Sequence, residues 1–128
     1  MSDSHADDAS TSLAELKRIV AEFVAERDWK QFHSPKNLSM AMAIEVAELM
    51  EHFQWISMDE SRAVPEASEK RREIAEEMSD VFCYLLALAN EMQIDMTSSL
   101  QQKMVKNRAK YPSDVFQGRY GTEDLERD

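Results

Sequence analysis

The longest regular pattern of apolar positions lies between residues 73 and 92. Apolar side chains recur there at alternating steps of four and three, at Ile74, Met78, Val81, Leu85, Leu88 and Met92. This spacing is typical of an α-helix that buries one stripe of its surface. Because no Pro or Gly interrupts the segment and strong helix formers dominate it, the pattern predicts a helix over residues 73–92.

An amphipathic pattern closer to the N-terminus predicts a first helix of about three turns. Ser12 and Glu15 have the spacing of a capping box, which satisfies two backbone N–H groups at the start of a helix. Apolar residues then follow with helical spacing, at Leu13, Leu16, Ile19, Val20, Phe23 and Val24. We expect this helix to end near Arg27, and the aromatic-rich residues 28–33 to form a connector.

A second helix is predicted over residues 35–55. Ser34 followed by Pro35 is typical of an N-cap and a first helical position. The stripe expected to be buried consists of Leu38, Met42, Val46, Leu49, Phe53 and Ile56. Residues 57–69 break the apolar period and contain Pro65, so they predict a loop with room for one helical turn.

The last predicted helix covers residues 96–110. Asp95 is a suitable N-cap, and Pro112 would end the helix. Its apolar residues, expected to point inward, are Met96, Leu100, Met104 and Val105.

Composition agrees with an all-α protein of one domain. The 128 residues include only 2 Gly and 3 Pro, and 43% of them are hydrophobic. We expect a disordered, polar and acidic tail over residues 1–11, a helical domain over 12–112, and a mobile tail over 113–128.

The formal net charge of −10 argues against binding a nucleic-acid backbone without a cation between the two. It does not exclude polyphosphate ligands, because divalent metals can bridge acidic side chains to phosphate. Most of the acidic residues are explained by their contribution to solubility alone.

A cytoplasmic protein is expected. No apolar run approaches the roughly 18 residues of a membrane span, and the first residues lack the apolar stretch of a signal peptide. The single cysteine, Cys83, cannot form an internal disulfide.

Four carboxylates come as two pairs with the same spacing, Glu45 with Glu48 and Glu77 with Asp80. Residues three apart are neighbours on a helix, and each pair lies beside a predicted buried stripe. If the two helices pack antiparallel, all four carboxylates converge on one site. Oxygen ligands of this kind suit Mg²⁺, with Mn²⁺ as an alternative.

Other interpretations of these acids are open. Acids three apart on a helix are common on solvated surfaces, so the chain could also be a non-catalytic helical interaction module. No Cys/His cluster suggests zinc, and a ferritin-like di-iron site would need Glu-x-x-His pairs that the chain lacks. Glu73 could join the site or stay outside it, whereas Glu76 and Glu51 point away from the stripes.

Further candidates could bind phosphates. Lys103, Asn107 and Tyr111 are spaced by four, so they share one helical face. Cations and an amide would hold phosphate oxygens there, although a solvated face is the commoner explanation of such a pattern.

Aromatic residues could bind a nucleobase. Trp29, Phe32 and His33 in the connector could stack a base, although connector aromatics more often serve packing. Tyr84, one turn after Asp80, fits the rim of the core better on spacing alone.

Two acidic motifs and three other segments resemble one enzyme family. They are Glu45-Val-Ala-Glu48, Glu77-Met-Ser-Asp80, Glu26-Arg-Asp-Trp29-Lys-Gln-Phe32-His33, Pro35-Lys-Asn37-Leu38 and Lys103-Met-Val-Lys-Asn107-Arg-Ala-Lys-Tyr111-Pro112. Over about residues 13–112 the chain resembles the all-α nucleoside triphosphate pyrophosphohydrolases, or MazG-like superfamily, and within it the branch that hydrolyses dCTP. Ala47 departs mildly from that pattern, where relatives often have Gly.

The resemblance implies an Mg²⁺-dependent enzyme that cleaves a dNTP, such as dCTP or a related pyrimidine dNTP, to dNMP and pyrophosphate. By motif position, the metal ligands and catalytic residues would be Glu45, Glu48, Glu77 and Asp80. Phosphates or sugar would be bound by Lys103, Asn107 and Tyr111. The nucleoside pocket would be lined by Trp29, His33, Asn37, Trp55 and Tyr84.

The resemblance also implies a four- to five-helix bundle assembled as a dimer or a dimer of dimers, with pockets shared between subunits. A second apolar stripe on helix 73–92, at Phe82, Leu86 and Ala89, agrees with assembly because it exceeds what one neighbouring helix covers. We therefore expect a homotetramer.

Overall fold

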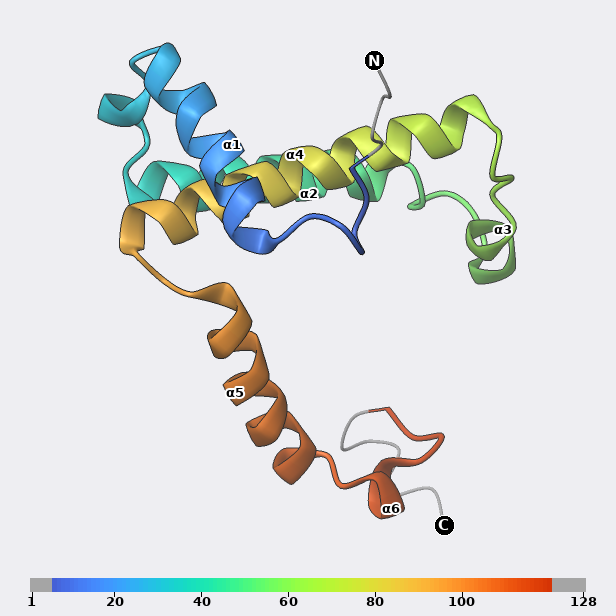
Figure 1. Cartoon of the computed structure of the whole chain (residues 1–128). Helices are drawn as coiled ribbons and strands as arrows, with labels where there is room; N and C mark the ends of the chain where they lie inside the picture. The colour runs from blue at the N-terminus through green and yellow to red at the C-terminus, as the bar shows by residue number, and fades with distance from the viewer. Residues whose placement is uncertain (1–5, 121–128) are drawn as a thin grey trace. The chain divides into compact units, whose positions relative to one another are not determined.

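The computed structural model describes residues 6–120, and all regular structure within them is helical (Figure 1). The elements are α1 (Leu13–Glu26), the 3₁₀ turn η1 (Lys30–Phe32), α2 (Pro35–Glu51), α3 (Met58–Arg62), α4 (Glu69–Met92), α5 (Met96–Lys110) and α6 (Ser113–Phe116). The chain divides into two compact units, one ending at Ile94 and the other beginning at Asp95. The all-α prediction is confirmed, although the boundary between the units falls inside the expected domain over 12–112.

Short polar side chains start the helices at the expected places. The Ser12 hydroxyl accepts a hydrogen bond from the backbone N–H of Glu15 at 3.2 Å, and the Glu15 carboxylate accepts one from Ser12 N–H at 2.8 Å. The predicted capping box at α1 is therefore confirmed. Ser34 caps α2 by accepting a hydrogen bond from the backbone N–H of Asn37.

Two helix boundaries differ from the prediction by four residues each. α2 ends at Glu51 rather than at residue 55, because the N–H groups of His52 and Phe53 bond carbonyls three residues back and tighten the chain into turns. α4 begins at Glu69 rather than at residue 73, because the Ser68 hydroxyl caps it. Neither the turns nor this cap changes the apolar pattern.

In the N-terminal unit, α4 packs along the antiparallel α2 and is crossed by α1 (Figure 1). The buried apolar residues are Val20, Leu38, Leu86, Ala87 and Ala89. Two hydrogen bonds tie α1 to the end of α4: Lys17 Nζ donates to the Ile94 carbonyl at 3.0 Å, and Asn90 Nδ2 donates to the Lys17 carbonyl at 2.9 Å.

The buried stripe predicted for α4 is partly wrong. Met78 and Met92, expected inside, are 55% and 53% exposed, while Leu86 and Ala89 are nearly inaccessible. The reason is that α1 packs on the neighbouring side of the C-terminal half of α4, where Val20 joins the core. The second stripe named above is thus covered at Leu86 and Ala89. Similarly, Val46 of α2 is 37% exposed.

The first described residues form a turn where disorder was expected. Ser10 N–H donates to the Asp7 carboxylate at 2.8 Å, and Asp7 N–H donates to the Ser10 hydroxyl at 3.1 Å. Residues 1–5 of the expected disordered tail lie outside the described part.

The C-terminal unit begins at the predicted cap. The Asp95 carboxylate accepts a hydrogen bond from Ser98 N–H at 2.9 Å, and α5 has the predicted bounds. Of the four apolar residues expected to point inward, Leu100 and Val105 are 60% and 64% exposed, Met104 is 38% exposed and Met96 is partly buried. After Pro112 the chain forms α6 where a mobile tail was expected, and residues 121–128 lie outside the described part.

Candidate functional site

Three of the four predicted acids converge between α2 and α4. Carboxylate oxygens of Glu45, Glu48 and Glu77 all lie within 4.8 Å of one another. The antiparallel helices bring together side chains that are far apart in the sequence, and the spacing of three keeps Glu45 and Glu48 on one face. Glu73 is exposed and is not part of this cluster.

The cluster is electrostatically strained without a cation. Burial raises the pKa of the Glu45 carboxyl, and contact with the Glu48 carboxyl raises it further. Burial likewise raises the pKa of Glu77, with Glu48 and Asp80 adding to the effect, whereas His52 acts in the opposite direction. Each shift means that the fully ionised cluster is disfavoured.

Two carboxylate oxygens of the cluster have no partner. Oε2 of Glu45 and Oε2 of Glu77 are buried and make no hydrogen bond. Within residues 6–120, the four ion pairs all lie elsewhere, so no Lys or Arg neutralises the acids. A buried acceptor without a donor is costly, and a hard cation with oxygen ligands would satisfy both atoms. The donor set therefore fits a divalent metal such as Mg²⁺ or Mn²⁺.

Asp80 links the acids to an aromatic cavity. It is exposed, and its charge raises the pKa values of Glu45 and Glu77, so it lies near the cluster without belonging to the tight group of three. Glu45 and Asp80 also line a cavity of about 260 Å³ together with Trp29, His33 and Tyr84. The structure thus brings five of the predicted residues to one place.

The aromatic side chains of this cavity form a continuous row. The Trp29 and His33 rings are 6.3 Å apart between centroids, and the His33 and Tyr84 rings 6.5 Å. Phe23 of α1 supports Trp29 edge-on at 5.6 Å. Nδ1 of His33 is buried without a hydrogen-bond partner. Flat apolar faces beside one polar atom suit a heteroaromatic ring.

Two other residues predicted to line the nucleoside pocket are not among those that line the aromatic cavity. The Asn37 side chain donates to the Phe32 carbonyl at 3.0 Å, which fastens η1 to the first turn of α2 rather than lining the cavity. Trp55 follows the end of α2 and is 87% exposed, outside the residues that line the cavity.

The three residues predicted to bind phosphate belong to the C-terminal unit. Tyr111 packs against Phe116 with 5.2 Å between ring centroids. Asn107 makes a long contact of 3.7 Å from Nδ2 to Sδ of Met104, and Lys103 is exposed.

Sequence reasoning missed several residues that line the aromatic cavity: Val20, Phe23, Val24, Cys83 and Ala87. For two of them a signal existed, because Cys83 and Ala87 follow Asp80 at the helical steps of three and seven. The residues of α1 carry no such signal, since apolar side chains on an amphipathic helix look alike whether they line a cavity or fill a core.

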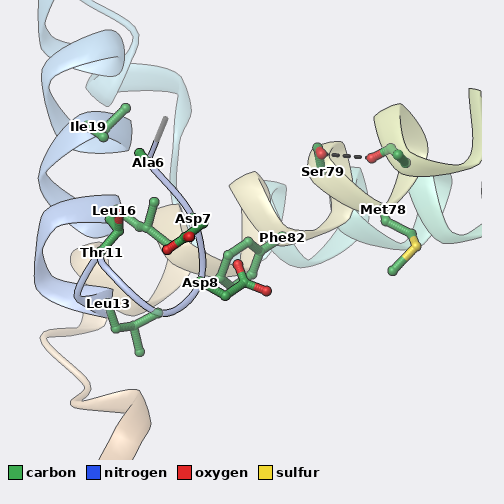
Figure 2. A pocket seen from close by; sticks show the side chains of 11 residues that line it. Ala6, Asp7, Asp8, Thr11, Leu13, Leu16, Ile19, Met78, Ser79 and Phe82 are labelled. Atoms are coloured by element: carbon green, nitrogen blue, oxygen red, sulfur yellow. Dashed lines mark hydrogen bonds between the residues drawn. The ribbon is translucent and has the colours of Figure 1, made fainter. Parts of the chain in front are cut away.

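Another cavity, of about 870 Å³, lies on a different side of α4. Figure 2 shows its walls, formed by Leu13, Leu16, Ile19, Met78 and Phe82, with the turn at residues 6–11 beside them. On a helix, Met78 and Phe82 point roughly opposite to Asp80. The acidic cluster takes no part in this cavity. The carboxylates that line it are those of Asp7 and Asp8 in the turn, and the Asp7 carboxylate already accepts a hydrogen bond from Ser10 N–H, so the cavity is a weaker candidate for the site.

Of the helices in residues 6–120, none is both long and apolar enough to cross a lipid bilayer. The one free cysteine in this part, Cys83, is partly buried in the aromatic cavity, and burial raises the pKa of its thiol.

Comparisons with known proteins match this chain to one family and to relatives that share one name. Residues 40–120 match the MazG-like family, a segment that contains all four predicted metal ligands. The protein dCTP pyrophosphatase 1 of Mus musculus is 43% identical over 107 residues, which cover 84% of this chain and 63% of that protein. The Homo sapiens protein of the same name is 43% identical over 102 residues, covering 80% and 60%. The chain therefore spans less than two thirds of the length of these relatives.

A solved structure has a similar fold. A pyrophosphatase from Archaeoglobus fulgidus, known from its crystal structure, is 44% identical to this chain in sequence. The two structures superpose with a TM-score of 0.72. The match covers 78% of this chain and 92% of that one.

Proposed function

Because this chain belongs to the MazG-like family, we propose that it is a metal-dependent nucleoside triphosphate pyrophosphohydrolase. Its substrate would be a dNTP, dCTP or a related pyrimidine dNTP, and its products dNMP and pyrophosphate. Relatives named dCTP pyrophosphatase 1 support the cytosine preference. Such an enzyme would remove unwanted nucleotides from the precursor pool.

The observation that carries this proposal is the position of the acids beside the aromatic cavity. Glu45 is part of the carboxylate cluster and Asp80 lies near it. Both residues also line the cavity that is lined by Trp29 and His33. A nucleoside triphosphate has the same order of parts, a flat base joined to a chain of phosphates that bind cations. A surface acid pair would not need an aromatic cavity next to it.

Each group of residues has a role in the proposed reaction. Glu45, Glu48, Glu77 and Asp80 would hold Mg²⁺, with Mn²⁺ as an alternative. When bound, the cation would act as a Lewis acid and activate water for attack on the α-phosphorus. The unpaired oxygens of Glu45 and Glu77 would be satisfied by the cation, and a carboxylate of the cluster would take up the proton of the attacking water.

The base and phosphates would be held by the other predicted residues. Trp29 and Tyr84 offer ring faces for the base, and Nδ1 of His33 offers one hydrogen bond. Trp55 is proposed to complete this pocket, and Asn37 to fix the connector on which Trp29 and His33 lie. The phosphates or the sugar would be bound by Lys103, Asn107 and Tyr111.

We also propose that the protein is cytoplasmic and forms a homotetramer. A reduced compartment fits the single, partly buried Cys83. Assembly is supported by a small core, which contains five buried apolar residues in the described part, beside many exposed large ones.

The test is a panel of the four dNTPs, assayed for pyrophosphate release with Mg²⁺, with Mn²⁺ and with a chelator. We expect divalent-metal-dependent release that is fastest with dCTP and forms one dNMP per pyrophosphate. Absence of release from any nucleotide in metal-saturated protein would favour the non-catalytic interaction module instead.

A further inference from the structure

The backbone between α1 and η1 bends at a residue type that seldom adopts the conformation found there. Asp28 has a φ of 53°, and within residues 6–120 it shares a positive φ with only one other non-glycine residue, Gln93. The left-handed region brings Cβ close to a carbonyl oxygen, so glycine is the usual residue at such a bend. An aspartate at this position therefore calls for an explanation in what its side chain does.

The end of α1 has the hydrogen bonds of a Schellman motif. Trp29 N–H donates to the Val24 carbonyl at 3.0 Å, and Asp28 N–H donates to the Ala25 carbonyl at 3.1 Å. An apolar contact often accompanies this motif, and here it is the edge-on contact between Phe23 and Trp29, with 5.6 Å between ring centroids. The conformation of Asp28 therefore decides where Trp29 enters the aromatic cavity.

Gln31 closes a bracket over this bend. Its Nε2 donates to the backbone carbonyl of Asp28 at 3.0 Å and to Oδ2 of Asp28 at 3.2 Å. We call these two hydrogen bonds the Asp28–Gln31 bracket. A glycine at position 28 would keep only the first of them. Gln93 has a φ of 54° at the end of α4, and no such bracket holds it within the described residues.

The bracket continues into a fixed link that reaches His33. In η1, Phe32 N–H donates to the Trp29 carbonyl at 2.9 Å, and His33 N–H donates to the Lys30 carbonyl at 3.1 Å. At the far end, the Asn37 side chain donates to the Phe32 carbonyl at 3.0 Å. The connector is thus held at both ends, and it carries two rings of the aromatic cavity, those of Trp29 and His33.

We propose that Asp28 and Gln31 are positioning residues for base recognition, which hold the Trp29 ring in the aromatic cavity before a nucleotide binds. Neither residue lines the cavity, so both would act through Trp29. The Trp29 side chain needs such a restraint because it is 43% exposed and its neighbours cover it only in part. Ordering a side chain during binding lowers affinity, and a restraint already present in the free protein avoids that loss. This inference rests on the proposed function, because the ligand that Trp29 meets is the base.

Kinetics separate positioning from stability. Asp28→Gly removes the Oδ2 hydrogen bond and the left-handed strain together, so its Tm should stay close to the natural value or rise. Its KM for dCTP should nevertheless rise by about 5- to 30-fold, the factor that corresponds to fixing the backbone of one residue. The kcat should stay within about twofold, because the acids on α2 and α4 keep their places.

Two further variants distinguish the bracket from a general effect of substitution. Asp28→Asn keeps a side-chain acceptor and tolerates the left-handed region, so its KM should stay within about twofold of the natural value. Gln93→Gly makes the same backbone change at the end of α4, outside the cavity, and should leave KM unchanged. A natural KM in Asp28→Gly would assign Asp28 a purely structural role and overturn the proposal.

A double-mutant cycle tests whether the two residues act as one unit. Gln31→Ala removes both hydrogen bonds of the bracket, so it should raise KM at least as much as Asp28→Gly. The double variant Asp28→Gly/Gln31→Ala should match Gln31→Ala alone, because no bracket is left to lose. Effects that multiply in the double variant would show independent roles and overturn the proposal.

Tryptophan fluorescence gives a readout that needs no turnover. Trp55→Phe leaves Trp29 as the single tryptophan, so acrylamide quenching without nucleotide reports on Trp29 alone. In this background, Asp28→Gly and Gln31→Ala should raise the quenching constant toward that of a fully exposed tryptophan, whereas Gln93→Gly should not. Unchanged quenching in both bracket variants would mean that the bracket does not order Trp29, which overturns the proposal.

The two readouts also keep this inference apart from the proposed function. Raised quenching with a natural KM would mean that the order of Trp29 does not limit base recognition, and the inference alone would fail. Absence of pyrophosphate release from the natural protein with every dNTP would refute the proposed function and this inference with it. Raised quenching together with a raised KM and a retained kcat is the result that we expect.

Discussion

Glu45 of α2 and Glu77 of α4 each point a carboxylate into one small space, where their oxygens approach within 4.8 Å. Each keeps one buried oxygen without a hydrogen-bond partner. Two such groups, with Glu48 beside them, repel each other unless a cation or a proton is shared. This relationship explains why metal, pH and single substitutions should all act on the same few atoms.

Metal binding should stabilise the protein through this cluster. A ligand that binds only the folded state at about 100 times its Kd contributes roughly 2.7 kcal/mol. Saturating Mg²⁺ should therefore raise the Tm of chelator-treated protein by several degrees in a thermal melt. Glu77→Gln should abolish that rise, whereas Glu76→Gln, an exposed acid on the same helix outside the cluster, should keep it. An unchanged Tm in metal-free natural protein would count against the site.

Substitution of the other two predicted metal ligands should lower activity much more than it lowers stability. Glu48→Gln or Asp80→Asn should reduce kcat/KM by more than the roughly 10- to 100-fold that loss of an outer partner of a metal site costs. Their unfolding free energies should fall little, because both acids are exposed and relieve like-charge repulsion when neutralised. Glu76→Gln serves again as the matched control, and equal losses in all three variants would mean that the helix faces are misassigned.

Stability without metal should fall as pH rises above about 4.5. Burial raises the folded-state pKa of Glu45 and Glu77 above the ordinary 4.5, so between the two values the folded state binds more protons than the unfolded chain. Stability then decreases with pH across that window and levels off above the raised pKa. Thermal melts in chelator from pH 4 to 8 should show this slope.

The control for the pH dependence is Glu45→Gln in the same buffers. Removing one titrating group should flatten the slope and raise the metal-free Tm at pH 7. With saturating Mg²⁺ the slope should reverse in the natural protein, because protons and metal compete for the same oxygens. A slope that is unchanged in Glu45→Gln would place its origin elsewhere.

Trp29 should control recognition of the base. Stacking on an aromatic side chain contributes about 1–3 kcal/mol per base, so Trp29→Ala should raise KM by about 5- to 150-fold and flatten the differences among dNTPs. Trp29→Phe should recover part of the loss, and Met58→Ala, 71% exposed and outside the cavity, should have no effect. If Trp29→Ala instead lowers Tm strongly and leaves base preference intact, Trp29 serves packing through Phe23.

Leu38 should be the residue on which the packing of α2 depends most. It is 1% exposed, and truncation of a buried Leu to Ala costs about 2–5 kcal/mol. We expect Leu38→Ala to lower the urea-unfolding free energy by that amount. Val105→Ala, 64% exposed on α5, should stay within about 0.5 kcal/mol of the natural protein.

The sequence by itself determined the helices and the candidate acids. Helical periodicity, a property of nearby residues, places α1, α5 and the middle of α2 and α4, and Ser12 with Glu15 specifies the first cap. The two motifs of spacing three likewise fix which carboxylates share a face. These features are local, so they can be read without knowing what packs against what.

Only the tertiary structure decided which faces are covered and which side chains meet. The crossing of α1 over α4 buries Leu86 and Ala89 and leaves Met78 exposed, although all three fit an apolar stripe equally well. The approach of Glu77 to Glu45, and the contribution of Val20 and Phe23 to the aromatic cavity, depend on contacts between distant segments. Apolar periodicity predicts that one face of a helix is buried. Which residues of that face are covered depends on the helix that packs against it, and that contact is between segments distant in the sequence.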